Sequence, residues 1–421
     1  MSETSGFHSG AHPQASGFGA QALWDAPTVT GITVDIDARA DELHRISHEI
    51  WLHPEVGYQE RFAAHELTGY LEQAGFAVER GVLGMDTAFV AHAGSGPITI
   101  GIVAEYDALP ELGHACGHNL FCTAAVGAAD ALARWVERAG IAARVSVFGT
   151  PAEEGATVPN GSGKVPFVEA GLFDDVDIAL MAHGAGETLI EKPTYAGYTY
   201  DVTFAGEAAH AGGSPWLGRN AQAAGVLLVN NINAVRQQLP PEIRLNPVFT
   251  GGTEVANTIP ARAELKVNMR ADTSDKLDGV IDAVERSVQA AALVTQTTSH
   301  IEPAQHRLDD LVPNHELALV WARALDELGE SYVQRAPRSG GCWDLGNVSH
   351  RVPTVGGYFK IGPHDLVGHT PAFRAAADSD QARSAVTVAA KTMALVGAAY
   401  IHVPEVRTSV RAEFSERFAN A

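Results

Sequence analysis

Residues 98–118 read ITIGIVAEYDALPELGHACGH, and this stretch gives the first indication of the fold. The apolar run at 98–104 predicts a short strand that is buried on both faces. An acidic segment beginning at Glu105 follows, and then come a thiol at Cys116 and an imidazole at His118. These are side chains that a divalent metal ion of borderline softness binds. The stretch therefore predicts a metal site next to a buried strand.

The neighbouring segments alternate between strand patterns and helix patterns. Helical spacing of apolar residues covers 36–75, with a break at His53-Pro-Glu55, and resumes at 119–138. In the second of these helices, Asn119 is the expected N-cap and Gly140 the expected stop signal. Further strands are expected within 77–103 and at 143–148 and 177–182. Strands that alternate with helices predict an α/β fold with a mostly parallel central sheet.

The pattern changes near Ala196, where a second domain is predicted. From 197 to 301 the expected order is strand, helix, strand, strand, helix, strand, as in a ferredoxin-like α+β sandwich. We therefore assign residues 31–195 and 303–421 to one α/β domain and residues 196–302 to an inserted domain. Residues 1–30 are rich in Gly, Ser, Ala and His and are expected to form a flexible arm.

The composition narrows the class of protein. A chain of 421 residues is too long for a single hydrophobic core, which agrees with two domains. The formal net charge of −21 argues against nucleic acid and anionic membranes as partners. We expect no secretory signal and no membrane span, and three cysteines do not form a disulfide framework. These features predict a cytoplasmic protein whose Cys116 stays reduced.

Three clusters of polar side chains each follow an expected strand. The clusters are Glu105 with Asp107, Glu153 with Glu154, and His183. The carboxyl ends of parallel strands meet at one edge of a sheet, where open α/β sheets bind ligands, so we expect the clusters to converge. Cys116 and His118 are two residues apart, which is the wrong spacing for one face of a helix, so a loop is expected to carry both. Alone, this pair also fits a buried thiol and a hydrogen-bonded histidine.

Adjacent carboxylates at Glu153 and Glu154 suggest divided roles. One can bind metal while the other takes a proton from a metal-activated water; two solvated loop acids are the alternative. Either His369 or His364 can complete the ligand set, although a single histidine is more often structural. The segment 160–164 resembles a phosphate-binding loop but lacks its first glycine and its final hydroxyl residue, so we reject nucleotide binding. The chain has no G-x-S-x-G motif of a serine hydrolase.

The ordered set of motifs resembles the M20 metallopeptidases, in particular the amidohydrolase branch that includes aminobenzoyl-glutamate hydrolase subunits and dipeptidase-like proteins. The resemblance spans about 50 to 375 and therefore covers most of the chain. The motifs that carry it are Leu52-His-Pro-Glu55, Glu105-Tyr-Asp-Ala-Leu-Pro110, Gly113-His-Ala-Cys-Gly-His-Asn119, Gly149-Thr-Pro-Ala-Glu-Glu154, Met181-Ala-His183, Ala208-Ala-His-Ala211, Asn257-Thr-Ile-Pro260, Asp344-Leu-Gly-Asn-Val-Ser349 and Gly368-His-Thr-Pro371. Cys342-Trp-Asp344 departs from the pattern, and Trp343 is expected to line or narrow the pocket.

The resemblance implies a catalytic domain that binds two divalent metal ions, zinc or manganese, and an inserted lid domain that forms a homodimer. The implied metal ligands are Cys116, His118, Glu154, His183 and His369, with Cys116 as the bridging ligand. Glu153 is implied as the general base, Asp107 as a supporting carboxylate, and His210 as a lid residue that polarises the scissile carbonyl in a neighbouring subunit. Asn257 and Arg270 are similar to lid residues that hold the substrate carboxylate; a surface salt bridge is the alternative for Arg270.

The resulting hypothesis is a metal-dependent hydrolase of an N-acyl or aminoacyl amino acid that bears a free carboxylate. An aminoacyl dipeptidase is the alternative within the enzymes. A catalytically silent metal-binding scaffold is the alternative from another class, and retention of Glu153 argues against it. A binding protein of the periplasmic type shares the two-domain α/β pattern but does not need the ligand set.

Overall fold

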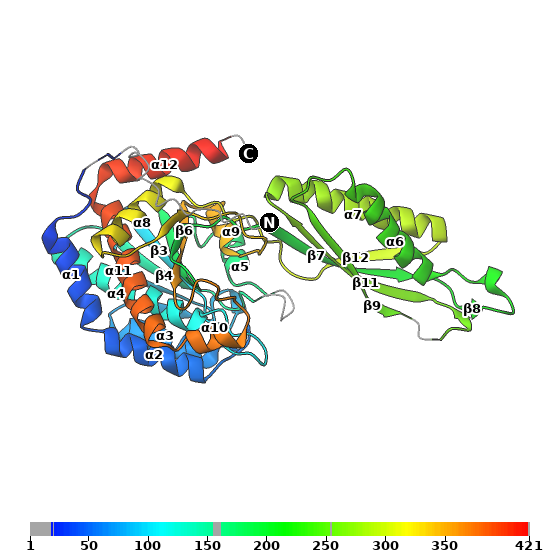
Figure 1. Ribbon diagram of the computed structural model, residues 1–421, viewed down its shortest axis with the longest axis horizontal. Helices are drawn as coiled ribbons and strands as arrows, with labels where there is room; N and C mark the ends of the chain where they lie inside the picture. The colour runs from blue at the N-terminus through cyan, green and yellow to red at the C-terminus, as the bar shows by residue number, and fades with distance from the viewer. Residues whose placement is uncertain (1–17, 20, 155–160, 253–254, 420–421) are drawn as a thin grey trace, which may run out of the picture.

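The computed structural model describes residues 18–19, 21–154, 161–252 and 255–419. These residues form two parts, each with its own sheet, and the second part projects away from the first (Figure 1). The chain enters the second part once and leaves it once, at 196 and 303.

The larger part is formed by both ends of the described chain. Before the insertion it contains α1 (Ala26–Asp37), α2 (Ala40–Leu52), α3 (Arg61–Gln73), β1 (Ala77–Arg80), the 3-10 turn η1 (Val82–Gly84), β2 (Phe89–Gly94), β3 (Thr99–Ala104), α4 (His118–Ala139), β4 (Arg144–Gly149), α5 (Lys164–Glu169), β5 (Ile178–Ala185) and β6 (Leu189–Glu191). After the insertion it contains α8 (His315–Glu327), β13 (Val333–Arg335), α9 (Leu345–Ser349), β14 (Thr354–Lys360), α10 (Pro371–Ala376), α11 (Asp380–His402) and α12 (Pro404–Phe418).

These strands form one eight-stranded sheet in the order β1-β2-β4-β3-β5-β14-β6-β13. The central strands β4, β3, β5 and β14 run parallel, as alternating strands and helices predict. Antiparallel pairs join β1 to β2, β2 to β4, and β14 to β6, so the complete sheet is mixed. The parallel strands all end at one edge, and this edge carries the polar clusters.

The core of this part lies between the sheet and long apolar helices. Every residue of β3 is buried, which fits its β-branched and small side chains in the middle of the sheet. The helices α4 and α11 pack against each other over this core. By length and composition α11 could cross a membrane, but 78% of its most apolar 18-residue window is buried inside the protein. It is therefore the core helix of a folded domain.

The inserted part is a four-stranded antiparallel sheet with two helices. Its elements are β7 (Ala196–Ala205), β8 (Ala209–His210), the 3-10 turn η3 (Pro215–Leu217), α6 (Ala221–Arg236), β9 (Arg244–Gly252), β10 (Thr258–Ile259), β11 (Arg262–Ala271), α7 (Ser274–Thr295) and β12 (Thr298–Pro303). The strand order β12-β7-β11-β9 with α6 and α7 packed together is the ferredoxin-like arrangement that the sequence predicts. A two-stranded ribbon of β8 and β10 extends its far end (Figure 1).

Several predicted boundaries differ from the structure. The segment 1–30 was expected to be flexible, but α1 already begins at Ala26, and Phe18 and Leu23 are buried in the core. Residues 1–17 and 20 of that segment lie outside the described residues. The helix α4 begins at His118 rather than after Asn119, because Gly117 with its positive φ of 84° is the cap. It stops at Gly140, as predicted.

Candidate active site

A cavity of about 470 Å³ opens at the carboxyl ends of β4, β5 and β14. Seven of its lining residues are side chains singled out from the sequence, namely Cys116, Glu153, Glu154, His183, Trp343, His364 and His369. His118 and Asp107 lie directly beneath them and are almost fully buried. The structure therefore brings together all five predicted metal ligands, the predicted base and the supporting carboxylate.

His118 is held in one orientation by Asp107. Its Nδ1 donates to the carboxylate Oδ1 of Asp107 at 3.1 Å and to the backbone carbonyl of Asp107 at 2.9 Å. This leaves Nε2 with its lone pair directed into the site, as metal-binding histidines require. Although burial opposes protonation, the Glu105 carboxylate and the Cys116 thiol outweigh it and raise the pKa of His118.

Cys116 and His183 meet across the site. The Sγ of Cys116 lies 3.3 Å from Nε2 of His183, whose Nδ1 donates to the Gly184 carbonyl at 2.9 Å. His183 lies inside β5, opposite Tyr358 of β14, whereas the sequence predicted a strand that ends before it. Burial lowers the pKa of His183 to about 4, which keeps its imidazole neutral and able to bind metal.

Glu154 and His369 form the outer side of the site. Nε2 of His369 lies 3.1 Å from Oε1 of Glu154. The backbone of His369 adopts a positive φ of 60°, and its N–H donates to the Ala115 carbonyl at 2.9 Å. Thr370 then caps α10, so this helix fixes the segment that carries His369. His364, which the sequence offered as an alternative ligand to His369, instead pairs with Glu187 at 3.1 Å.

Glu153 is placed by a strained turn after β4. Ala152 has a positive φ of 59°, and its N–H donates to the carboxylate of Glu60 at 2.8 Å. The next two residues, Glu153 and Glu154, then have different partners. The backbone N–H of Glu154 donates to Asp107 at 2.8 Å, and Oε2 of Glu153 lies 3.7 Å from Nε2 of His118.

The environment of Glu153 favours its protonated form. Burial is the main cause that raises the pKa of Glu153, and the nearby carboxylates of Glu105 and Glu154 raise it further. A raised pKa makes a carboxylate a stronger base, and the protonated group can later return the proton, which is the property of a general base that later acts as an acid.

The donor set fits divalent metal ions. Three groups of donor atoms each lie within 4.8 Å of one another; they are Cys116-His118-His183, Cys116-Glu154-His369 and Glu105-His118-Glu153. Cys116 belongs to two groups, as expected of a ligand between two ions. Nε2 of His118 and Oε1 of Glu105 are buried without a hydrogen-bond partner among the described residues, although they lie 3.3 Å apart. Burying such polar atoms costs free energy unless a ligand such as a metal ion binds them.

The predicted lid residues lie at opposite ends of the inserted part. His210 is exposed in β8 at the far end, with its Nδ1 accepting from the N–H groups of Gly212 and Gly213 at 3.2 and 2.9 Å (Figure 1). Asn257 is beside it, its carbonyl accepting from Ala211 at 2.9 Å. The structure does not bring these two residues to the cavity of their own chain. Arg270 lies at the near end and donates to the Gly340 carbonyl at 2.8 Å.

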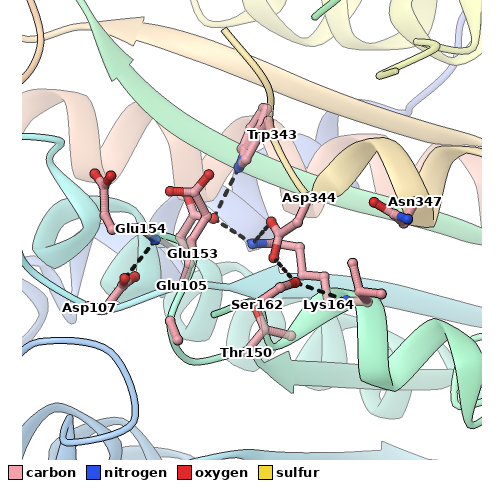
Figure 2. Close-up of polar contacts among 12 residues, drawn as sticks. Glu105, Asp107, Thr150, Glu153, Glu154, Ser162, Lys164, Trp343, Asp344 and Asn347 are labelled. Atoms are coloured by element: carbon pink, nitrogen blue, oxygen red, sulfur yellow. Dashed lines mark hydrogen bonds and ion pairs between the residues drawn. The ribbon is translucent and has the colours of Figure 1, made fainter. Parts of the chain in front are cut away.

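Sequence reasoning missed a buried ionic network beside the cavity, which Figure 2 shows. Nζ of Lys164 donates to Glu105 and to Asp344, both at 2.6 Å, and all three side chains are buried. Ser162 donates to the second oxygen of Asp344 at 2.7 Å. The lysine of the segment that resembles a phosphate-binding loop therefore belongs to an internal ion cluster at the start of α5.

Trp343 completes this network. It is buried, lines the cavity as the departure from the motif suggested, and donates its indole N–H to Glu105 at 3.1 Å (Figure 2). Its ring also packs edge-on against His183, with centroids 5.3 Å apart. Burial raises the pKa of Glu105, but Lys164, His118 and His183 together outweigh burial and lower this pKa to about 2.

Comparison with known proteins identifies the family. The chain is 36% identical to the Xaa-Arg dipeptidase of Mus musculus over 397 residues, which cover 90% of each protein. It is 34% identical to one of the p-aminobenzoyl-glutamate hydrolase subunits of Escherichia coli over 313 residues, covering 70% of this chain and 64% of that protein. The chain belongs to the M20 family of metallopeptidases. Within this M20 protein, residues 197–296 match the peptidase dimerisation domain.

Solved M20 structures have the same fold. A Bacillus subtilis protein described as a dinuclear metal binding peptidase from the M20 family superposes with a TM-score of 0.65 at 20% identity, covering 86% of this chain and 98% of its own. The aminobenzoyl-glutamate utilization protein of Klebsiella pneumoniae gives a TM-score of 0.65 at 21% identity, covering 86% of this chain and 96% of its own. As a member of the M20 family, this protein is a metal-dependent enzyme that hydrolyses amide bonds.

Proposed function

We propose that this enzyme cleaves an N-acyl or aminoacyl amino acid that bears a free carboxylate, with Glu153 as the general base. The observation that carries the proposal is the arrangement of donor atoms around Cys116 and His118, with Glu153 directly beside them. We propose two metal ions per chain, held by Cys116, His118, Glu154, His183 and His369, because these five residues supply two groups that share Cys116. Zinc and manganese are both compatible with the mixed thiolate, imidazole and carboxylate set.

Divalent ions in these positions supply Lewis acidity, which lowers the pKa of water and polarises a carbonyl group. Glu153 takes the proton of the attacking water and then delivers it to the leaving amine nitrogen, so the proton balance closes within one turnover. Asp107 keeps His118 in the tautomer that presents Nε2 and also holds the backbone of Glu154. The strained turn at Ala152 fixes the position of Glu153 against this framework.

An aminoacyl dipeptidase is the second candidate. The similarity that favours it is the 36% identity to a protein named Xaa-Arg dipeptidase over 90% of both chains. The match to the p-aminobenzoyl-glutamate hydrolase of Escherichia coli supports an acyl-amino-acid substrate instead. Both substrate classes place a carboxylate on the amino acid that leaves.

We further propose that the enzyme works as a homodimer through the inserted domain, whose residues 197–296 match a dimerisation domain. The large apolar side chains that are exposed among the described residues of this part are Trp216, Leu217, Val226, Val248, Phe249, Val255, Leu293 and Val294. A dimer that covers them would remove this surface from water. His210, exposed at the far end, would then serve the cavity of the second copy by stabilising the oxyanion.

One experiment tests this function. The purified enzyme is analysed for bound metal and assayed on alanyl-arginine, p-aminobenzoyl-glutamate and N-acetyl-arginine. We expect metal to be bound, chelation to abolish hydrolysis, and Zn²⁺, Mn²⁺ or Co²⁺ to restore it. Hydrolysis of the dipeptide alone would favour the dipeptidase. Hydrolysis that survives complete metal removal, or no hydrolysis of any amide by metal-loaded protein, would contradict the proposal.

A further inference from the structure

Lys192 is the one lysine or arginine among the described residues that line the catalytic cavity. It lies just after β6, in the short linker that leads into β7 and the inserted part. Its backbone neighbours run beside a second linker, since the Pro193 carbonyl accepts from Ser339 at 2.8 Å and Tyr195 donates to Gly341 at 2.9 Å. The side chain is half-buried. The fold thus places one flexible cation at the wall of the site.

The ring of Tyr358 lies between Lys192 and the proposed metal ligand His183. Its Nζ is 4.4 Å from the centroid of the Tyr358 ring, and that ring is 5.2 Å from His183, centroid to centroid. Trp343 packs against the same tyrosine, with centroids 5.7 Å apart. The cation and the two aromatic side chains therefore form one wall of the cavity beside the proposed metal centre.

Within the part of the chain that the structure describes, Lys192 has no acidic partner. No described carboxylate oxygen lies within 4.0 Å of the Lys192 Nζ, which is the limit for an ion pair. This Nζ also makes no hydrogen bond to a described residue. Lys164, by contrast, is fully buried and pairs with two carboxylates, each at 2.6 Å. Of the acids that line the cavity, Glu187 pairs with His364 and Glu154 with His369. A half-buried ammonium group without an anion is unfavourable, and an anionic ligand would relieve this cost.

Arg270, the lid cation singled out by the family resemblance, is placed differently. It is not among the residues that line the cavity, and its guanidinium donates to the Gly340 carbonyl of the second linker. In the conformation seen here, Lys192 is therefore better placed than Arg270 to meet a substrate inside the cavity.

We propose that Lys192 binds a carboxylate of the substrate and so determines the preference for acidic substrates. This inference rests on the proposed function and adds a residue to it. The carboxylate has two possible sources, the α-carboxylate of the leaving amino acid and a carboxylate on the acyl half. Both offer the ammonium group a charge-assisted hydrogen bond in place of its contact with the Tyr358 ring alone.

The test compares Lys192→Met, which keeps the length of the side chain without its charge, with Lys192→Arg and with wild type. One pair of substrates is alanyl-arginine and alanyl-argininamide, which differ in the α-carboxylate. The other pair is N-succinyl-arginine and N-acetyl-arginine, which differ in an acyl carboxylate. The control is Lys266→Met on β11, an exposed lysine that pairs with Asp201 at 2.9 Å. Metal content is measured for every variant.

We expect Lys192→Met to lose about 10- to 100-fold in kcat/KM for the acid member of one pair, as for removal of a charged hydrogen bond. The loss should fall mainly on KM, should spare the member of that pair that lacks the carboxylate in question, and should be partly restored in Lys192→Arg. A loss that separates the two members of the first pair but falls equally on both members of the second identifies the α-carboxylate. A loss that separates the two members of the second pair and spares the first pair identifies the acyl carboxylate.

An equal loss on both members of each pair, or full retention of the wild-type preference in Lys192→Met, would overturn the inference while the proposed function stands. Lack of any preference for the acid members in wild type would overturn it as well. Absence of hydrolysis of all four substrates by metal-loaded wild type would instead contradict the proposed function, and the inference would fall with it.

Discussion

Cys116 joins the two halves of the site. Its sulfur is the atom shared by the group that contains His183 and the group that contains Glu154 and His369. Burial raises the pKa of the Cys116 thiol, so the protein alone favours the neutral form. A bound divalent cation would reverse this preference, because a coordinating thiol is deprotonated by the charge of the metal. Metal binding and loss of the thiol proton are therefore expected to be coupled.

The first prediction replaces this thiol. Cys116→Ser substitutes a hydroxyl that does not ionise, so metal affinity should fall by at least about tenfold and metal should be lost on dialysis. Elemental analysis after dialysis measures the remaining metal per chain. The matched control is Cys122→Ser in the core of α4, where the thiol donates to the Asn119 carbonyl, and it should keep its metal. Wild-type metal content in Cys116→Ser would contradict the shared-ligand assignment.

At this scale, the sequence shows the metal-binding side chains but not their support. Histidines, a cysteine and carboxylates after apolar runs are unusual enough to predict the converging ligands. Lys164 follows a run of Gly and Ser in the sequence and carries no local signal of burial. Only the packing of Glu105 and Asp344 around it explains why a lysine is fully buried there. His210 and Asn257 are also identified by motif alone, because the role proposed for them depends on a second copy of the chain.

At the scale of elements, the Lys164 network connects three segments that are distant in sequence. Lys164 begins α5, Glu105 directly follows β3, and Asp344 caps α9. Since Glu105 also faces His118 at 3.3 Å, the network fixes the end of β3 against the site. Removing one member of a buried ion cluster leaves its partners charged and unpaired.

The second prediction tests this connection. Lys164→Met should lower the free energy of unfolding by about 3–5 kcal/mol, because two buried carboxylates lose their counter-charge. Urea unfolding followed by tryptophan fluorescence measures the change. The exposed pair of Lys266 and Asp201 gives the control, and Lys266→Met should change stability by less than about 1 kcal/mol. Equal stability of the two variants would show that the network does not stabilise the fold.

The sequence pattern predicts most helices and strands correctly, but it predicts the residues at which they begin and end less accurately. The alternation that predicts β3, α4, β4 and β5 is long and apolar, so the central parallel sheet is confirmed. The outer strands β6 and β13 have only three residues each, and their directions, antiparallel for β6 beside β14 and parallel for β13 beside β6, depend on tertiary contacts. His118 and His183 fall inside a helix and a strand because Gly117 and the pairing with β14 set these boundaries.

At the scale of the whole molecule, the inserted part carries two of the predicted functional residues away from the cavity of their own chain. His210 and Asn257 lie at the far end of this part, beyond the sheet (Figure 1). A rigid ferredoxin-like sheet of this kind is better suited to reach a second copy of the chain than to fold back on its own. The proposed homodimer would place each far end at the site of the other copy.

The third prediction follows from this arrangement. Glu153→Gln protein mixed with His210→Ala protein should recover part of the wild-type activity, up to about one quarter of it. Hybrid dimers make up half of a random mixture, and one of their two sites contains both intact groups. Mass spectrometry of the mixture verifies subunit exchange, and each variant alone is the baseline. Confirmed exchange without recovered activity would show that His210 does not act on the second copy.

The central claim is that Glu153 moves the proton in a metal-dependent hydrolysis, and the most direct test is kcat of Glu153→Gln measured together with its metal content. The account predicts wild-type metal content and a loss of about 10²- to 10⁴-fold or more in kcat, as for a missing general base. Glu137→Gln, at an exposed position of α4, is the control and should keep full activity. Near-normal turnover by metal-loaded Glu153→Gln would contradict the claim.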